Sequence, residues 1–226
     1  MSRGGVVKDP RDPRPAASTV DRGAAPNPSG AGTKVRLGSL HRCATGAAAF
    51  LLLTLAACAP VKPLPALGQV PQFQLLLPDG QPFDSRLLDG HIWVANFIYT
   101  TCPGPCPMMS HQMRGIQNST GGTPEVKLVS FTVDPAHDTP PVLARYAAFF
   151  KADTNRWYFL TGEMERLNLL GLNTFKLNSV DGSLSHSTRF VLVDRRRQIR
   201  GYYLSSDEAF PGNLLHDIRQ LQREPS

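Results

Sequence analysis

The body of this chain carries almost no excess charge, which limits the partners it can have. The net charge of +6 lies mainly in residues 1–57, where eight Lys and Arg accompany three Asp and Glu; the remaining 16 basic and 15 acidic residues nearly cancel. That body has no stripe of Lys and Arg with interleaved aromatic residues, which argues against a nucleic-acid partner. It also lacks an internal repeat, and its roughly 150 residues are enough to bury one core.

A long apolar run is missing too. The most apolar stretch, ATGAAAFLLLTLAAC, ends at Cys58 and is short for a membrane span. It is preceded by Lys34, Arg36 and Arg42, and a basic segment before a short apolar one is typical of a secretory signal. Its last four residues, LAAC, resemble the lipobox of bacterial lipoproteins, which are cleaved before the cysteine and lipidated on its sulfur.

This interpretation divides the chain into three parts. We expect residues 1–57 to form a disordered leader with a lipoprotein signal peptide, residues 58–69 a Pro-rich spacer lipidated at Cys58, and residues 70–226 a folded domain. The domain would then be a membrane-anchored lipoprotein on the periplasmic, extracytoplasmic side. An uncleaved anchor helix in place of the signal peptide is the alternative.

Cysteine is scarce as well, with four in the chain. Cleavage would remove Cys43 and lipidation would occupy Cys58, which leaves Cys102 and Cys106 in TTCPGPCPMM. A disulfide across three intervening residues closes too small a loop to stabilise the fold much. We therefore expect these two thiols to have a chemical role, either in redox exchange or in holding a soft metal.

Strand-like and helix-like segments alternate from about residue 70, which predicts an α/β fold. The predicted strands span 72–77, 91–99, 125–133, 156–162, 188–194 and 198–204, the last two as a hairpin. The predicted helices cover 107–117, 138–150, 163–175 and 207–222. Pro107 is expected at the first helical position, Thr139 as an N-cap, and Gly171 as a weak point of its helix.

The order of strand, cysteine-containing loop and helix is how thioredoxin-like domains present a reactive thiol. The helix N-terminus turns its free N–H groups and positive dipole end towards the sulfur, which favours the thiolate. The sequence therefore predicts a thioredoxin-like α/β fold, with a central mixed sheet flanked by helices.

A third ligand has to come from elsewhere in the chain, and His186 is the best candidate among the six histidines. It lies directly before a predicted strand, after a polar loop long enough to reach the cysteines. His137 follows the second buried strand, on the carboxyl-end side where ligands gather in α/β sheets, and we expect it beside the site. The others are assigned to the leader, a strand end or helix surfaces: His41, His91, His111 and His216.

Three segments resemble, in order and spacing, the signature segments of the Sco/SenC family: FIYTTCPGPCPMM, SFTVDPAHDTPPVLARYAAFF and HSTRFVLVD. The resemblance covers about residues 68–222. It implies a thioredoxin-fold, membrane-tethered, copper-binding protein that helps to assemble the copper centre of cytochrome c oxidase. It places the family's cysteine pair on Cys102 and Cys106, its copper-binding histidine on His186, and its aspartate near the copper site on Asp134. Pro105 departs from the family pattern, in which a hydrophobic residue is common.

The donor set agrees with this resemblance. Two thiolates and an imidazole suit copper, because soft sulfur favours Cu(I) and the histidine helps to accommodate Cu(II); zinc with an added water would also accept them. Nearby Met108, Met109 and Met113 are expected to pack into the core, with copper transit as the lesser alternative.

Two functions follow from these residues. The first is a copper metallochaperone that delivers copper to a subunit of cytochrome c oxidase. The second is an extracytoplasmic thiol–disulfide oxidoreductase that keeps the oxidase cysteines reduced, for which Cys102 and Cys106 are the catalytic redox pair and His186 is not needed. A thiol peroxidase and a copper- or redox-responsive sensor are further alternatives.

Overall fold

A computed structural model describes residues 62–225 of the chain. The predicted leader, Cys58 and the first residues of the predicted spacer lie outside the described residues. None of the helices described is both long and apolar enough to cross a membrane.

A mixed sheet forms the centre of the domain, as predicted. It has six strands, in the order β1-β8-β7-β4-β5-β6. Its strands are β1 (Gly68–Gln69), β4 (Ile92–Ile98), β5 (Val126–Thr132), β6 (Trp157–Leu160), β7 (Arg189–Val193) and β8 (Gln198–Leu204). The strands β4, β5 and β6 are parallel, whereas β7 runs antiparallel to β4, and β8 to β7 and β1. A separate hairpin consists of β2 (Gln74–Leu76) and β3 (Pro82–Asp84).

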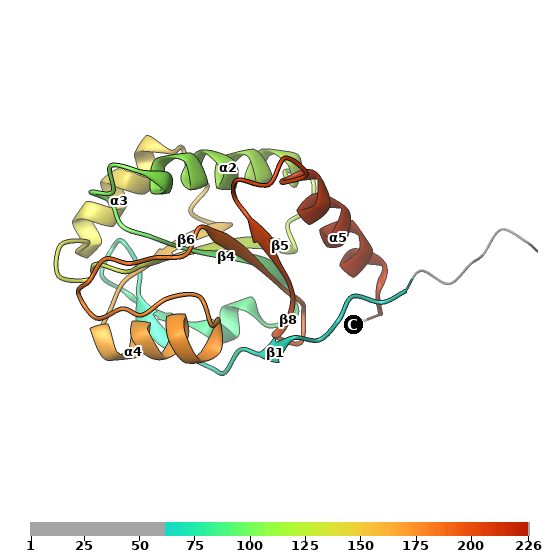
Figure 1. Cartoon of the computed structure of the whole chain (residues 1–226), viewed down its shortest axis with the longest axis horizontal. Helices are drawn as coiled ribbons and strands as arrows, with labels where there is room; N and C mark the ends of the chain where they lie inside the picture. The colour runs from blue at the N-terminus through green and yellow to red at the C-terminus, as the bar shows by residue number, and fades with distance from the viewer. Residues whose placement is uncertain (1–61, 226) are drawn as a thin grey trace, which may run out of the picture. The chain divides into compact units, whose positions relative to one another are not determined.

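Helices cover both faces of this sheet (Figure 1). One face packs against α2 (Pro105–Ser119), α3 (Pro140–Phe149) and α5 (Gly212–Arg223). The other face packs against the 3₁₀ turn η1 (Ser85–Leu88), α4 (Met164–Asn168) and the π-helical turn η2 (Leu169–Thr174). Strand β4 serves both cores, because successive side chains point to opposite faces: Ile92 and Val94 belong to the first core, and Trp93 and Ala95 to the second.

The helix after the cysteines begins two residues earlier than predicted. Gly104 is its N-cap and Pro105, not Pro107, is its first residue. A proline costs nothing there, because the first N–H groups of a helix have no partner within it. The consequence is that Cys106 lies in the first helical turn, and not in the loop before the helix.

Two other helix predictions have different outcomes. Thr139 is the N-cap of α3 and Pro140 its first residue, as predicted. The predicted helix 163–175 is wrong as a single helix, because α4 ends at Asn168 and gives way to η2. Gly171 lies in η2, where an added Cβ would come within 2.7 Å of the Asn178 carbonyl oxygen. This close approach explains why a glycine occupies that turn.

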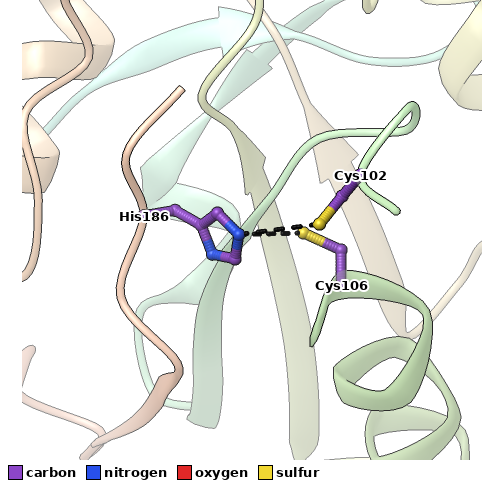
Figure 2. Close-up of side chains that lie close together, drawn as sticks. All are labelled: Cys102, Cys106 and His186. Atoms are coloured by element: carbon purple, nitrogen blue, oxygen red, sulfur yellow. Dashed lines mark hydrogen bonds between the residues drawn. The ribbon is translucent and has the colours of Figure 1, made fainter. Parts of the chain in front are cut away.

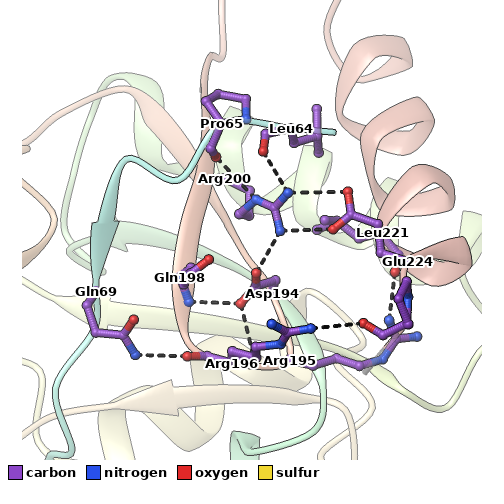
Figure 3. Close-up of polar contacts among 11 residues, drawn as sticks. Leu64, Pro65, Gln69, Asp194, Arg195, Arg196, Gln198, Arg200, Leu221 and Glu224 are labelled. Carbon is purple, nitrogen blue, oxygen red and sulfur yellow. Dashed lines mark hydrogen bonds and ion pairs between the residues drawn. The ribbon is translucent and has the colours of Figure 1, made fainter. Parts of the chain in front are cut away.

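The last part of the predicted spacer lies against the sheet (Figure 3). The buried Arg200 guanidinium donates to the carbonyl oxygens of Leu64 (2.7 Å) and Pro65 (3.2 Å). It also pairs with Asp194 at 2.8 Å and with Glu224 at 3.0 Å. These contacts hold the chain start of the domain at the end of the sheet where β4 begins.

Arg200 is therefore expected to contribute strongly to stability. Arg200→Met keeps most of the apolar stem but leaves Asp194 nearly buried without its guanidinium, and we expect a loss of about 3 kcal/mol. Urea unfolding should show a lower midpoint with an unchanged slope. Arg86→Met is the matched control, because the Arg86 side chain in the Arg86–Asp84 pair is exposed, so the substitution should change the midpoint little. Equal midpoints for the parent and Arg200→Met would contradict this role.

Candidate metal centre

The topology brings three distant donors to one end of the sheet. Cys102 lies in the loop after β4, and Cys106 in the first turn of α2. His186 precedes β7, which runs antiparallel to β4. A residue just before β7 therefore lies near the carboxyl end of β4, although it follows Cys106 by 80 residues.

The three side chains point towards one another (Figure 2). His186 Nε2 lies 3.5 Å from Cys106 Sγ and 3.7 Å from Cys102 Sγ, and the three donor atoms are all within 4.8 Å of each other. An ion bonded to sulfur at about 2.3 Å and to nitrogen at about 2.0 Å would hold those two donors about 3.5–3.8 Å apart, for tetrahedral to trigonal angles. The donors thus fit a single shared metal ion.

The imidazole of His186 is arranged as a ligand. Its Nδ1 lies 3.3 Å from the Ser187 carbonyl oxygen, an acceptor that favours the tautomer with the proton on Nδ1 and the lone pair of Nε2 facing the sulfurs. Burial lowers the pKa of His186 against a smaller, opposite effect of that carbonyl. The ring is therefore neutral at neutral pH, which is the form that binds metal.

The two thiols differ in acidity. Burial alone would raise the pKa of Cys102, but hydrogen bonds with the Cys106 and Gly104 backbones outweigh burial and bring it below the ordinary value. Burial raises the pKa of Cys106 well above its usual range, despite the N–H that Tyr99 donates to its sulfur. Cys102 is therefore the more acidic thiol of the metal-free pair, and Cys106 holds its proton more tightly.

Asp134 and His137 were expected beside the site. Within residues 62–225, neither is hydrogen-bonded to the Cys102 sulfur, the Cys106 sulfur or the His186 ring. Asp134 accepts a hydrogen bond from the backbone N–H of His137, so it closes the turn after β5. His137 has a half-exposed side chain, and its Nδ1 lies 3.1 Å from an oxygen of Asp138. Both lie in the loop at the carboxyl end of β5, close in sequence to the residue that does support the cysteines.

Asp138 is the residue that sequence reasoning missed. Its carboxylate is fully buried and accepts hydrogen bonds from the backbone N–H (3.1 Å) and hydroxyl (2.5 Å) of Thr100 and from the hydroxyl of Thr132 (2.6 Å). Thr100 stands two residues before Cys102, so this carboxylate ties the cysteine loop to the end of β5. The available signal was an acidic residue after a buried strand, but Asp138 could equally have been an exposed residue of the helix start.

Asp138→Asn should loosen the cysteine loop. An amide has one acceptor oxygen and no charge, while three donors face this site, so we expect a loss of about 2–3 kcal/mol. Hydrogen exchange at the Thr100 amide should become faster in the variant than in the parent. This increase should be larger than any increase at the amides of the sheet. Asp134→Asn is the control, because Asp134 does not contact Thr100 through a hydrogen bond. Unchanged protection at Thr100 in the Asp138 variant would refute this role.

The remaining candidates lie away from the three donors. His111 packs its ring against Phe150, and His91 Nδ1 lies 3.0 Å from the carbonyl oxygen of Asp89. His216 is exposed on α5, and His41 lies outside the described residues. Met109 and Met113 are fully buried in the core, as predicted. The packing prediction is wrong for Met108, which is 45% exposed because it lies on the opposite side of α2 from Cys106.

Known proteins are similar to this chain in sequence and in fold. Residues 64–223 match the family model described as SCO1/SenC. A protein of Stutzerimonas stutzeri, provisionally named a copper-binding protein, is 34% identical over 147 residues, which cover 62% of this chain and 71% of that protein.

Two solved structures have a similar fold. A SCO1/SenC family lipoprotein from Bacillus anthracis str. Ames is 30% identical, with a TM-score of 0.65 over 73% of this chain and 100% of that chain. BsSco is described as having a disulfide switch and as a member of the Sco family of cytochrome c oxidase assembly proteins; it is 25% identical, with a TM-score of 0.63 over the same shares. These likenesses confirm the predicted thioredoxin-like α/β fold.

Proposed function

This chain belongs to the SCO1/SenC family, and on that premise we propose that it binds copper through Cys102, Cys106 and His186 and delivers it to the copper centre of cytochrome c oxidase. The observation that carries the proposal is the convergence of two sulfurs and one imidazole nitrogen, with nitrogen–sulfur separations of 3.5 and 3.7 Å. Copper is cargo in this account, taken up by the three donors and later passed on.

The chemistry of the donors favours copper as that cargo. Thiolate sulfur prefers Cu(I), and the imidazole lets the same site accept Cu(II). Zinc would accept the same donors with a water as fourth ligand. Support for copper over zinc comes from the relative in Stutzerimonas stutzeri, whose provisional name assigns it copper binding.

Delivery requires that a partner's ligands reach the ion while it is still bound. The site supplies three protein ligands, which leaves room in the coordination sphere for an incoming one. Cys102 retains 6% of its surface exposed and His186 is half-buried, whereas Cys106 is fully buried. Exchange would therefore begin on the side of Cys102 and His186, with Cys106 the last ligand released.

We further propose that the protein is a lipoprotein anchored through Cys58 on the extracytoplasmic side. The lipobox-like LAAC before the spacer supports this location. The family lipoprotein of Bacillus anthracis provides independent support. Mass spectrometry of the N-terminal peptide would test it, with a diacylglyceryl group on Cys58 as the expected result and an intact leader as the opposing one.

A thiol–disulfide oxidoreductase is the second candidate, favoured by the unequal acidities of the thiols. The Cys102 thiolate would attack a substrate disulfide, forming a mixed disulfide and releasing one substrate thiolate. Cys106 would then attack Cys102 Sγ while its proton passes to the departing substrate sulfur, which leaves as the second thiol. The resulting Cys102–Cys106 disulfide would be reduced again by a dithiol reductant. The disulfide switch described for BsSco is consistent with such a pair.

A transfer experiment separates the two functions. Parent protein and His186→Ala are offered Cu(I), passed through a desalting column, and mixed with the metal-free copper-centre domain of cytochrome c oxidase. The carrier function predicts copper transfer from the parent and little transfer from the variant. The reductase function does not need His186, so the parent and the variant should reduce a model disulfide peptide at similar rates. Equal copper transfer by the variant and the parent would refute the proposed carrier role of His186.

A further inference from the structure

Tyr99 occupies the position where the two cores and the metal centre meet. It is the first residue after β4 and immediately precedes the cysteine loop. Its side chain is partly buried and packs against both hydrophobic cores, one on each face of the sheet. Tyr99 is thus held from both sides at the carboxyl end of β4, which is a rigid place from which to position a neighbour.

Tyr99 contacts each of the three donor residues. Its backbone N–H donates to Cys106 Sγ at 3.4 Å, and its carbonyl oxygen accepts the N–H of Cys102 at 3.3 Å. Its ring meets the His186 imidazole with centroids 5.4 Å apart and planes inclined at 76°. This edge-to-face arrangement is one that pairs of aromatic rings prefer. The first two contacts use the backbone and survive substitution, whereas the contact with His186 depends on the ring. The Tyr99 hydroxyl is a further hydrogen-bond partner of Cys102.

Few other contacts within residues 62–225 hold the ring of His186. It lies in residues 175–188, which form neither helix nor strand. Among the described residues, its ring nitrogens are hydrogen-bonded to the two sulfurs and to the carbonyl of the adjacent Ser187. A loop side chain with contacts of this kind can occupy several rotamers, and the observed one aims Nε2 at both sulfurs.

We propose that Tyr99 is a positioning residue of the metal centre, whose ring holds the His186 imidazole against the two sulfurs before any metal arrives. The effect of Tyr99 on copper binding rests on the proposed function, whereas its effect on the orientation of the His186 ring does not. A ligand that is already oriented loses less conformational freedom when copper binds. The bound ion should then also leave more slowly, because the imidazole cannot swing away while the sulfurs still hold it.

The decisive comparison uses metal-free protein and three variants. Tyr99→Phe keeps the ring and removes only the hydroxyl, while Tyr99→Leu and Tyr99→Ile remove the ring and keep apolar volume at the sheet end. The NMR signals of the His186 ring protons report its packing, because the tyrosine ring current shifts them. We expect sharp, shifted signals in the parent and in Tyr99→Phe, and broadened signals near the values of an unpacked histidine in both aliphatic variants.

Copper release provides the second readout. With a chelator in excess, release of Cu(I) from the aliphatic variants should be about three to ten times faster, the size expected from losing one edge-to-face pair, and within twofold of the parent for Tyr99→Phe. Unchanged His186 signals in a folded aliphatic variant, or loss of the shifted signals in Tyr99→Phe, would overturn the proposal. If the parent binds no copper, the proposed function fails, and the metal-free NMR comparison still decides the role of Tyr99.

Discussion

Replacing His186 with alanine is expected to weaken copper binding by about 100-fold or more, since even the loss of a group that merely orients a ligand costs 10- to 100-fold. The two sulfurs remain in place, because their positions depend on the cysteine loop and on α2, and not on the imidazole. Competition with a chromogenic Cu(I) chelator, under reducing conditions, measures the affinity. The thiols of the variant should still react fully with a disulfide reagent.

His216→Ala is the matched control for this experiment. It removes a histidine that is exposed on α5 and distant in the fold from the cysteine loop. Its copper affinity should equal that of the parent. A His186→Ala protein with parental affinity would show that the imidazole contributes nothing to the ion, and the dithiol alone would have to explain any copper binding.

The second large effect concerns the thiols themselves. At neutral pH, alkylation of the metal-free, reduced protein by iodoacetamide should be confined to Cys102, because only the thiolate reacts and the pKa of Cys106 lies far above its usual range. Cys102→Ser should therefore slow alkylation by more than about 100-fold, since each pH unit below a pKa cuts the thiolate tenfold. Cys106→Ser should keep most of the reactivity, because the Gly104 N–H still reaches the Cys102 sulfur.

The pH dependence of alkylation tests the direction in which the pKa of each thiol is shifted. A thiol whose pKa is lowered stays ionised to lower pH than an ordinary cysteine, so the alkylation rate of Cys106→Ser should fall at a lower pH than that of an ordinary cysteine. Alkylation of Cys102→Ser should still be rising at the alkaline end of the titration. If the two variants have interchanged rates, Cys106 is the nucleophile, and the order of attack proposed for the reductase reaction is wrong.

Some of this architecture was predictable because its causes lie within short segments. The nearly continuous apolar run at 91–99 is typical of a buried strand, and β4 is buried at all seven of its positions. The approach of His186 to the cysteines was predicted from the polar loop before its strand and from the family resemblance. The antiparallel pairing of β7 with β4, which brings that loop to the cysteine end of the sheet, is seen in the structure and was not predicted.

Other features depend on contacts between distant segments and leave no local signal. Asp138 anchors the cysteine loop through hydrogen bonds from Thr100 and Thr132. Only these buried contacts distinguish it from an ordinary residue at a helix start. The pairing of β1 with β8 is similar, because two residues of Pro-rich chain become a strand only when Arg200 and the edge of the sheet supply partners. The predicted start of α2 was two residues too late, because each proline of the cysteine loop fits a first helical turn equally well.

X-ray absorption at the copper edge tests the central claim most directly. Protein offered one equivalent of Cu(I) should show two sulfur neighbours at about 2.3 Å and one nitrogen neighbour at about 2.0 Å, and the nitrogen should disappear in His186→Ala. A copper ion with two sulfurs and no nitrogen in the parent, or one whose neighbours are unchanged by the loss of His186, would contradict a centre built from these three side chains.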